Sequence, residues 1–234
     1  ANIYRNYASY IRGDGYQRVI CGPSGGDTQW TETILKGLEG KTHLVQGVSL
    51  HYYTLPTGDW DHKGSSTDFK EDMWFATLRN TLLIEDYIKN HLAVMDKYDP
   101  EGKIKLIVDE WGTWYDKLLG TKDGFLQQQN TVRDAVVAGI NLNIFNRYAG
   151  RISMANIAQI VNVLQSVILT NGPEMVKTPT YHVFKMYSVH QDARLLPAAH
   201  RVRVGGDDLA EERVEPAGRD PGVPPAERLV ERAD

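Results

Sequence analysis

The sequence predicts an α/β fold organised around a parallel sheet. Short apolar runs alternate with longer segments of helical period, which is the arrangement of successive βα units. The 234 residues include a single cysteine, so no internal disulfide can substitute for a hydrophobic core. A chain of this length can bury such a core within one domain of ordinary size.

Three short apolar runs are expected to form strands of that sheet. They span residues 18–21 (RVIC), 44–50 (LVQGVSL) and 104–108 (IKLIV). A last βα unit is expected over 152–169, and 181–189 (YHVFKMYSV) is predicted as a further strand. Together these elements would make about half of an eight-stranded barrel.

Helical periodicity fills the intervals between the runs. Residues 1–12 are expected to form a helix of an earlier unit, which would place the start of the chain inside a domain. The clearest helix is predicted from Asp68, with Glu71 as its capping-box partner, to the stop at Asp99-Pro100. Its apolar positions are Trp74, Leu78, Leu82, Ile84, Ile88, Leu92 and Met95. Another helix is expected over about 128–142.

The last stretch of the chain has a different composition. From Arg201 to Asp234 only Arg, Val, Gly, Asp, Leu, Ala, Glu and Pro occur. So little bulky apolar content cannot offset the entropy of ordering, and we expect disorder. Each of these residues has a codon that begins with G or C. A frameshifted reading of a GC-rich gene is therefore one explanation, and a natural linker is the other.

Charge and hydropathy exclude several classes of partner. The 26 basic and 30 acidic side chains give a net charge of -4, which argues against a nucleic-acid-binding protein. No apolar run approaches the roughly 20 residues that a membrane span requires. The opening residues also lack the features of a signal peptide. We expect no nucleic acid, membrane, metal or cofactor among the partners.

Polar and aromatic side chains follow the second run. Strand alternation puts His51 and Tyr53 on one face and Tyr52 on the other. An imidazole and a phenol at this end could orient a neighbouring carboxylate; the alternative is a hydrogen-bonded packing pair. The turn 22–26 after the first run is rich in glycine, but it lacks the Lys-Ser/Thr of a phosphate-binding loop.

Two acids follow the third run, and this stretch is the most informative one. Asp109 and Glu110 would be costly beside a buried strand unless they are hydrogen-bonded or functional. Trp111, Trp114 and Tyr115 offer flat apolar faces on which sugar rings can stack. This pattern suggests a glycosidase in which one carboxylate attacks the anomeric carbon. The alternative is that both acids cap loops and the tryptophans belong to the core.

The segment VDEWGTWYD (108–116) closely resembles the nucleophile strand of the α-L-arabinofuranosidases of glycoside hydrolase family 51. The resemblance continues, in family order, through 49–60 (SLHYYTLPTGDW), 128–146 (QQNTVRDAVVAGINLNIFN), 154–165 (MANIAQIVNVLQ) and 178–193 (TPTYHVFKMYSVHQDA). It covers nearly all of residues 1 to about 197. The resemblance implies a partial (β/α)8 TIM barrel, roughly strands 5 to 8, over 1–177. It further implies the start of a C-terminal β-sandwich over 178–197, which leaves 198–234 as the unusual tail.

The resemblance also implies roles for five residues. Glu110 matches the catalytic nucleophile, which forms a covalent arabinosyl intermediate in a retaining mechanism. Tyr53 matches a tyrosine whose hydroxyl contacts that carboxylate, and His51 matches a histidine that lines the site. Gln159 matches a glutamine that binds the arabinose, and Trp114 matches a tryptophan beside the scissile bond. Trp60 and Asn156 are weaker candidates.

The chain departs from the family pattern in two respects. Family members often carry His and Asp where Tyr148 and Gly150 stand here. The family's general acid/base is a Glu that follows an Asn at the end of the fourth barrel strand, and no Asn-Glu pair occurs in this sequence. We therefore expect the chain to hold the nucleophile without its proton donor and to be inactive alone.

The implied activity is release of terminal non-reducing α-L-arabinofuranosyl groups from oligosaccharides or polysaccharides. The resemblance further implies a cytoplasmic, homo-oligomeric enzyme, since family members are often hexameric. Another retaining barrel glycosidase, of xylosidase or glucanase type, is one alternative. A non-catalytic carbohydrate-binding or assembly fragment is the other.

Overall fold

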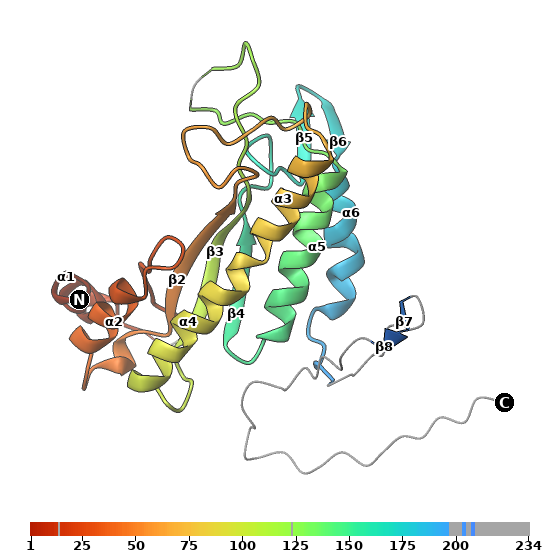
Figure 1. The fold of residues 1–234 in the computed structure, drawn as a ribbon. Helices are drawn as coiled ribbons and strands as arrows, with labels where there is room; N and C mark the ends of the chain where they lie inside the picture. Colours follow the sequence, from red (N-terminus) through yellow and green to blue (C-terminus); the bar gives the residue numbers. More distant parts are fainter. Residues whose placement is uncertain (14, 123, 197–202, 205–206, 209–234) are drawn as a thin grey trace. The chain divides into compact units, whose positions relative to one another are not determined.

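Four parallel strands form the central sheet, in the spatial order β1-β2-β3-β4 (Figure 1). They are β1 (Val19–Ile20), β2 (Gly47–Thr54), β3 (Lys105–Thr113) and β4 (Ile152–Ile157). Each strand pairs in parallel with the next strand along the chain. The predicted α/β class with a parallel sheet is confirmed, and the three predicted runs each contribute a strand.

The computed structural model describes residues 1–13, 15–122 and 124–196, and the backbone of 203–204 and 207–208. Residues 1–196 and residues 197–234 form two separate units. In the second unit, β7 (Arg203–Val204) pairs antiparallel with β8 (Asp207–Asp208). The rest of the stretch for which we predict disorder lies outside the described residues.

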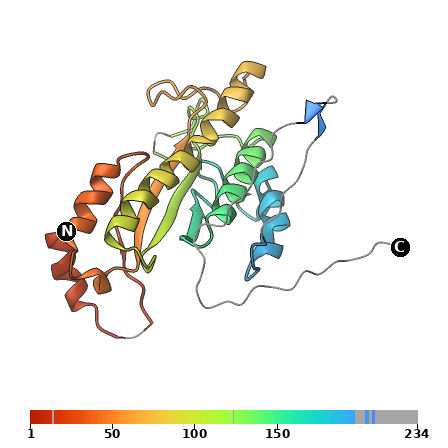
Figure 2. The ribbon, with the colours of Figure 1, turned by 60° about the horizontal axis from the view of Figure 1, so that its bottom comes forward.

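Six α-helices accompany the sheet in the first unit's described residues. They are α1 (Asn2–Tyr10), α2 (Thr28–Gly37), α3 (Glu71–Thr81), α4 (Leu83–Tyr98), α5 (Val132–Arg147) and α6 (Pro179–Tyr187). Short 3-10 turns span Thr42–Leu44 and Ser188–His190. In both ribbon views α5 and α6 lie side by side (Figures 1 and 2). The helix predicted over 1–12 is confirmed as α1.

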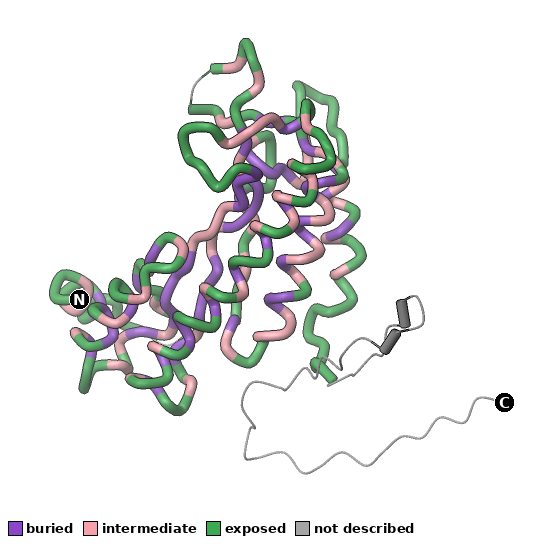
Figure 3. Tube along the Cα trace, viewed as in Figure 1, coloured by how far each residue is buried: buried purple, intermediate pink, exposed green. Residues whose placement is uncertain are grey.

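The core lies between the sheet and the helices. Leu50 on β2 and Val108 on β3 are fully buried, and they belong to one cluster with Leu35 of α2, Ile88 of α4 and Ala138 of α5. Figure 3 shows the buried stretches concentrated in the central strands and in parts of the helices. The carboxyl ends of the strands therefore extend from a well-packed core.

A β-bulge interrupts the pairing of β2 with β3. Ser49 lies opposite Ile107, but His51 lies opposite Glu110, so β3 contains one extra residue in this interval. Val108 and Trp111 both belong to the core cluster, although strict alternation would put Glu110 in the place that Trp111 takes. The bulge thus lets Asp109 and Glu110 both avoid the helix-packed core.

The structure corrects the predicted helix over Asp68–Asp99. A break at Leu82 divides it into α3 and α4, and α3 begins at Glu71 after Lys70, which makes no side-chain cap. The capping box is wrong because Glu71 is itself the first helical residue. Asp68 remains in the loop, where its backbone N–H donates to Ser65 Oγ at 2.9 Å.

The predicted helix within 152–169 is also wrong. After β4 the chain runs through a loop into a hairpin of β5 (Ile168–Asn171) and β6 (Glu174–Lys177). Asn162 and Leu164 have positive φ angles of 59° and 49°, which a right-handed helix does not allow. The Asn162 side chain instead binds Thr170, accepting from its N–H at 2.7 Å.

The strand predicted over 181–189 is wrong as well, because helix α6 occupies most of this segment. Thr178 caps the helix, and Pro179 occupies its first turn, where a missing N–H costs nothing. Val183 and Tyr187 stand one helical turn apart and both pack on the core. The sandwich strand expected in 178–197 is therefore not formed in the described residues; the division at 178 stays a prediction.

The helix expected over about 128–142 is present as α5 (Val132–Arg147), which begins and ends slightly later in the chain. Thr131 and Asp134 form a capping box at its start. Burial raises the pKa of Asp134, although hydrogen bonds from Thr113 and Thr131 oppose that rise.

Among the described residues, every helix is too short or too polar to span a lipid bilayer.

Tyr148, at the position where family members often have His, anchors an ion pair between α4 and α5. Glu85 accepts hydrogen bonds from Arg147 Nη1 at 2.7 Å and from Tyr148 Oη at 2.9 Å. Burial opposes ionisation of Glu85, but these bonds lower its pKa below the ordinary value. Burial and the same carboxylate raise the pKa of Tyr148 to about 12.

Glu85→Gln is expected to lower the free energy of unfolding near neutral pH by about 1.5–3 kcal/mol, the usual contribution of a hydrogen bond to a charged group. A carboxyl with a lowered pKa stabilises the fold above its unfolded-state pKa, and this contribution is lost as the pH falls through the folded-state pKa. The difference between variant and parent should therefore shrink from about pH 5 towards about pH 3. Urea unfolding at both pH values, with the exposed Asp86→Asn as control, measures it. An equal difference at both pH values would contradict the assignment.

Candidate active site

Tyr53 and Glu110 meet across the pairing of β2 with β3. The Tyr53 hydroxyl donates to Glu110 Oε2 at 2.8 Å. The Glu110 side chain remains 46% exposed, so its carboxylate is held by a protein donor and still open to a ligand. The contact is of the kind that the resemblance implies for Tyr53, and the roles of the two residues stay a prediction.

His51 lies between the two acids of β3. Its Nε2 is 3.1 Å from Asp109 Oδ1, and its Nδ1 is 3.5 Å from Glu110 Oε2. The bulge in β3 makes this arrangement possible, because both carboxyl groups have left the core side of the strand. His51 therefore separates the two carboxylates and can orient Glu110 from the side opposite the core.

Three aromatic rings form a wall beside Glu110. The Tyr53 ring packs edge-to-face against Trp114, with centroids 4.9 Å apart, and Trp114 packs edge-to-face against Trp60 at 5.4 Å. The third pair, Tyr53 with Trp60, is 6.4 Å apart. Trp60 is 51% exposed, so part of this wall faces solvent, as a surface for stacking sugar rings requires.

Tyr53 is also electrostatically tuned by its surroundings. Burial is the main cause that raises its pKa above the ordinary tyrosine value, and the hydrogen bond and charge of Glu110 raise it further. The phenol therefore stays protonated and acts as a hydrogen-bond donor to the carboxylate throughout the physiological pH range.

Gln159 is placed differently from the other predicted residues. It follows the end of β4 and is exposed, and the neighbouring Ala158 N–H donates to Trp111 O at 2.9 Å. The residue thus reaches the same edge of the sheet, but no hydrogen bond joins its side chain to Tyr53 or Glu110 among the described residues. Asn156 is exposed on β4, and its Nδ2 lies 3.4 Å from Met154 Sδ.

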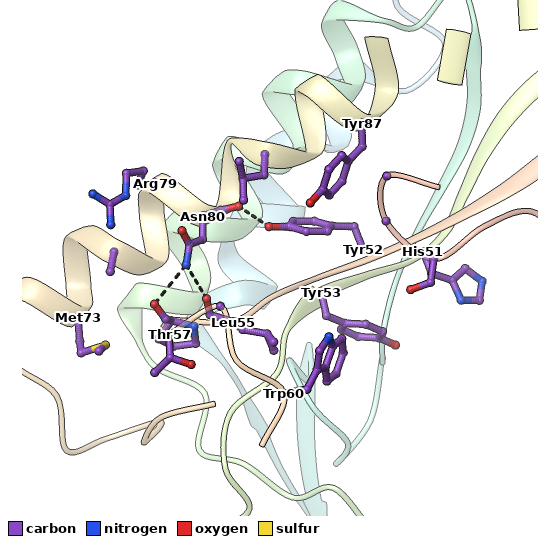
Figure 4. A pocket seen from close by; sticks show the side chains of 17 residues that line it. His51, Tyr52, Tyr53, Leu55, Thr57, Trp60, Met73, Arg79, Asn80 and Tyr87 are labelled. Atoms are coloured by element: carbon purple, nitrogen blue, oxygen red, sulfur yellow. Dashed lines mark hydrogen bonds between the residues drawn. The ribbon is translucent and has the colours of Figure 1, made fainter. Parts of the chain in front are cut away.

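A cavity of about 640 Å³ adjoins the cluster without containing Glu110. Figure 4 shows Tyr53 and Trp60 on one side and Tyr52, Asn80 and Tyr87 on the other. Asn80 is already engaged, since its side-chain Nδ2 donates to Leu55 O at 2.8 Å and its backbone carbonyl accepts from the Tyr52 hydroxyl. We take the Glu110 cluster as the candidate site because it places a half-exposed carboxylate and its hydrogen-bond donor Tyr53 beside this cavity at the strand ends.

Sequence reasoning misses the helix side of this cavity. Arg79, Asn80 and Tyr87 come from α3 and α4, and the periodicity of those helices marks only their apolar positions. Within the described residues, no group of three or more His, Cys, Asp and Glu side chains is arranged to hold a metal ion.

Comparison with known proteins identifies the family. Residues 109–214 match the domain described as "Alpha-L-arabinofuranosidase C-terminal domain". An "Intracellular exo-alpha-L-arabinofuranosidase" from Bacteroides ovatus is 50% identical over 200 residues, which make up 84% of this chain and 38% of that protein. The crystal structure of the GH51 arabinofuranosidase from Xanthomonas axonopodis pv. citri is 44% identical, with a TM-score of 0.76. Over most of its length the chain matches α-L-arabinofuranosidases of glycoside hydrolase family 51.

The chain spans about two fifths of the length of those relatives. The match with the Xanthomonas structure covers 89% of this chain and 43% of that chain. A third relative, the "Intracellular exo-alpha-(1->5)-L-arabinofuranosidase" of Streptomyces lividans, is 29% identical over 196 residues and is covered to 27% of its length.

The state of Tyr53 offers a test of the cluster. With tyrosine labelled at ¹³Cζ, the signal that Tyr53→Phe removes should still report the neutral phenol at pH 10, where an ordinary tyrosine is about half ionised. Glu110→Gln should move its titration to lower pH, though not to the ordinary value, because burial is the larger cause. Asp59→Asn, on the exposed loop, should leave it unchanged. A titration that ignores Glu110→Gln would show that the two side chains are not in contact.

Proposed function

We propose that this chain supplies the nucleophile side of a retaining exo-acting α-L-arabinofuranosidase. The hydrogen bond from the Tyr53 hydroxyl to Glu110, beside Trp114, is the observation that carries the proposal. It joins a half-exposed carboxylate, a fixed donor and an aromatic face at the carboxyl end of parallel strands. In such folds this edge is where catalytic side chains gather.

In the proposed reaction Glu110 attacks the anomeric carbon of the arabinofuranosyl group. Both of its protein contacts, Tyr53 and His51, involve Oε2. No hydrogen bond occupies Oε1 among the described residues, which leaves this oxygen to form the bond to carbon. The glycosidic bond breaks as the ester forms, and water later releases the sugar with net retention.

The leaving oxygen needs a proton from a second carboxyl group about 5–5.5 Å from the nucleophile. Asp109 lies close to Glu110, but His51 contacts it, and we do not assign it this task. The Asn-Glu pair that carries the acid/base in the family is absent from this sequence. Gln159 would bind the arabinose, as in the family, once a ligand draws its exposed side chain towards the cluster.

The proposal also covers the barrel, the substrates, the location and the oligomeric state. The four-stranded sheet corresponds to roughly strands 5 to 8 of a (β/α)8 barrel. The substrates would be arabinofuranosyl-containing oligosaccharides or polysaccharides, because the relatives' names specify that sugar. The word "intracellular" in those names supports the same location here, and homo-oligomer formation stays a prediction. In the first alternative, a different retaining glycosidase, the rest of the site would have to bind another sugar. In the second, a non-catalytic binding fragment, the exposed Trp60 would bind a sugar without any bond being broken.

The isolated chain is expected to show no turnover of an aryl α-L-arabinofuranoside, because it contains no assigned proton donor. Losing general acid catalysis costs about 10²–10⁴-fold in rate even in an intact site. Release of the aryl group is followed by absorbance under substrate excess, with Glu110→Ala as the matched blank. Sustained turnover that Glu110→Ala abolishes would overthrow the prediction of inactivity.

A substrate whose leaving group needs no proton tests the proposed nucleophile Glu110 independently of the general acid. With 2,4-dinitrophenyl α-L-arabinofuranoside, Glu110 should form the ester and expel dinitrophenolate, at most once per chain, because hydrolysis lacks its base. Peptide mass spectrometry should find the sugar on Glu110, and Tyr53→Phe should slow the burst. Labelling that persists in Glu110→Gln, or that favours a xylosyl probe, would support the other glycosidase. Saturable binding of arabinose without any burst would support the binding fragment.

A further inference from the structure

The two tryptophans of the aromatic wall lie on separate loops that have no regular secondary structure. Trp60 belongs to the loop 55–70 between β2 and α3, and Trp114 begins the loop 114–131 between β3 and α5. Trp60 and its neighbours from Thr57 to Asp61 are exposed. The ring centroids are 5.4 Å apart. The Trp114 N–H donates to Thr54 O on β2 at 3.1 Å, and further contacts join the two loops to each other.

Asp116 makes the first of these contacts. Its carboxylate accepts from the backbone N–H of Gly64 at 2.9 Å and from that of Lys63 at 3.3 Å. Its own N–H donates to Gly64 O at 2.9 Å. Three hydrogen bonds from one exposed residue thus tie the loop of Trp114 to the loop of Trp60, two residues from Trp114 in sequence.

Arg133 makes the second contact from inside the protein. Its side chain is fully buried at the start of α5, and its guanidinium lies between the rings of Phe69, at 3.7 Å, and Tyr115, at 4.3 Å. Its Nη2 donates to Ser65 O at 2.8 Å, and its Nε donates to Tyr115 Oη at 3.1 Å. The guanidinium therefore contacts Ser65 and Phe69 on the loop of Trp60 and Tyr115 on the loop of Trp114.

We propose that Asp116 and Arg133 are positioning residues that set the separation of Trp60 and Trp114. Neither side chain bonds to His51, Tyr53 or Glu110 in the described structure, so both act through the loops. The planar stack explains why the buried cation is an arginine, since lysine has no flat face to lie between two rings. The role in sugar binding rests on the proposed function; the geometry of the wall does not.

The first experiment reads the wall without a sugar. The chain is labelled with 5-fluorotryptophan, and its five tryptophan signals are assigned by single Trp→Phe variants. Asp116→Ala should shift or broaden the ¹⁹F signals of Trp60 and Trp114 and leave those of Trp30 and Trp111 in place. Asp96→Ala, which removes another exposed aspartate with an ion pair to Arg151, is the matched control and should move neither wall signal.

Arg133→Lys tests the buried contact in the same spectra. It keeps the charge but loses the stack and the two-pronged hydrogen bonding, so the same two signals should move. Because this variant could also disturb folding, Asp116→Ala decides the outcome, with thermal unfolding of Asp116→Ala and Asp96→Ala expected to agree. Unchanged Trp60 and Trp114 signals in Asp116→Ala would overturn the proposal.

The second experiment adds arabinose and follows the Trp114 signal. Asp116→Ala should weaken the apparent affinity for arabinose at least threefold relative to Asp96→Ala. When Trp60→Phe is added to both variants, most of that difference in affinity should disappear. An equal affinity in both aspartate variants overturns the link to sugar binding. If the parent chain does not respond to arabinose, the proposed function fails, while the sugar-free spectra still judge the positioning role.

Discussion

The candidate site depends on a β-bulge in β3. A strand that alternates strictly can send only every second side chain away from the core, and here two adjacent acids must leave it. The extra residue between Val108 and Trp111 resolves this conflict. It keeps both apolar side chains packed against the helices and turns Asp109 and Glu110 towards His51. Removing the bulge would place a carboxylate in the core or the Trp111 indole outside it, and either is costly.

Glu110 combines openness with restraint in a way that its neighbours explain. Its donor, Tyr53, is held on the adjacent strand and stays protonated because burial raises its pKa. Its second contact, His51, is itself held at 3.1 Å from Asp109. In the proposed reaction, a carboxylate fixed in this manner would lose little further freedom as it attacks, which is the advantage of preorganised groups in catalysis.

The sequence places the candidate residues at one edge of the sheet, but it does not give their contacts. His51, Tyr53 and Glu110 follow apolar runs, and parallel strands bring the ends of those runs to one edge. The contact between Tyr53 and Glu110 is what the family resemblance implies, because the pattern alone also allows a hydrogen-bonded packing pair. The bulge does not follow from the pattern either, because it depends on the pairing of two strands. Helix α6 has apolar positions that fit either period, and only the Thr178-Pro179 cap decides for a helix. Asp116 and Arg133 lie outside any pattern, since their partners on the loop of Trp60 are backbone atoms and one ring some fifty to seventy residues away.

Two kinds of contact thus divide the work of building the site. The Tyr53–Glu110 pair needs only neighbouring strands and the core beneath them, and all of these are within one folded unit. Its geometry therefore does not require the other strands of a barrel. The aromatic wall combines strand and loop contacts. Tyr53 belongs to β2, and the Trp114 N–H donates to Thr54 O on the same strand at 3.1 Å. The loop of Trp60 is joined to the loop of Trp114 by Asp116 and Arg133, to which we assign the separation of the two rings. Under the proposed function, substitutions at these two positioning residues would therefore alter how a sugar is held without altering which oxygen attacks it.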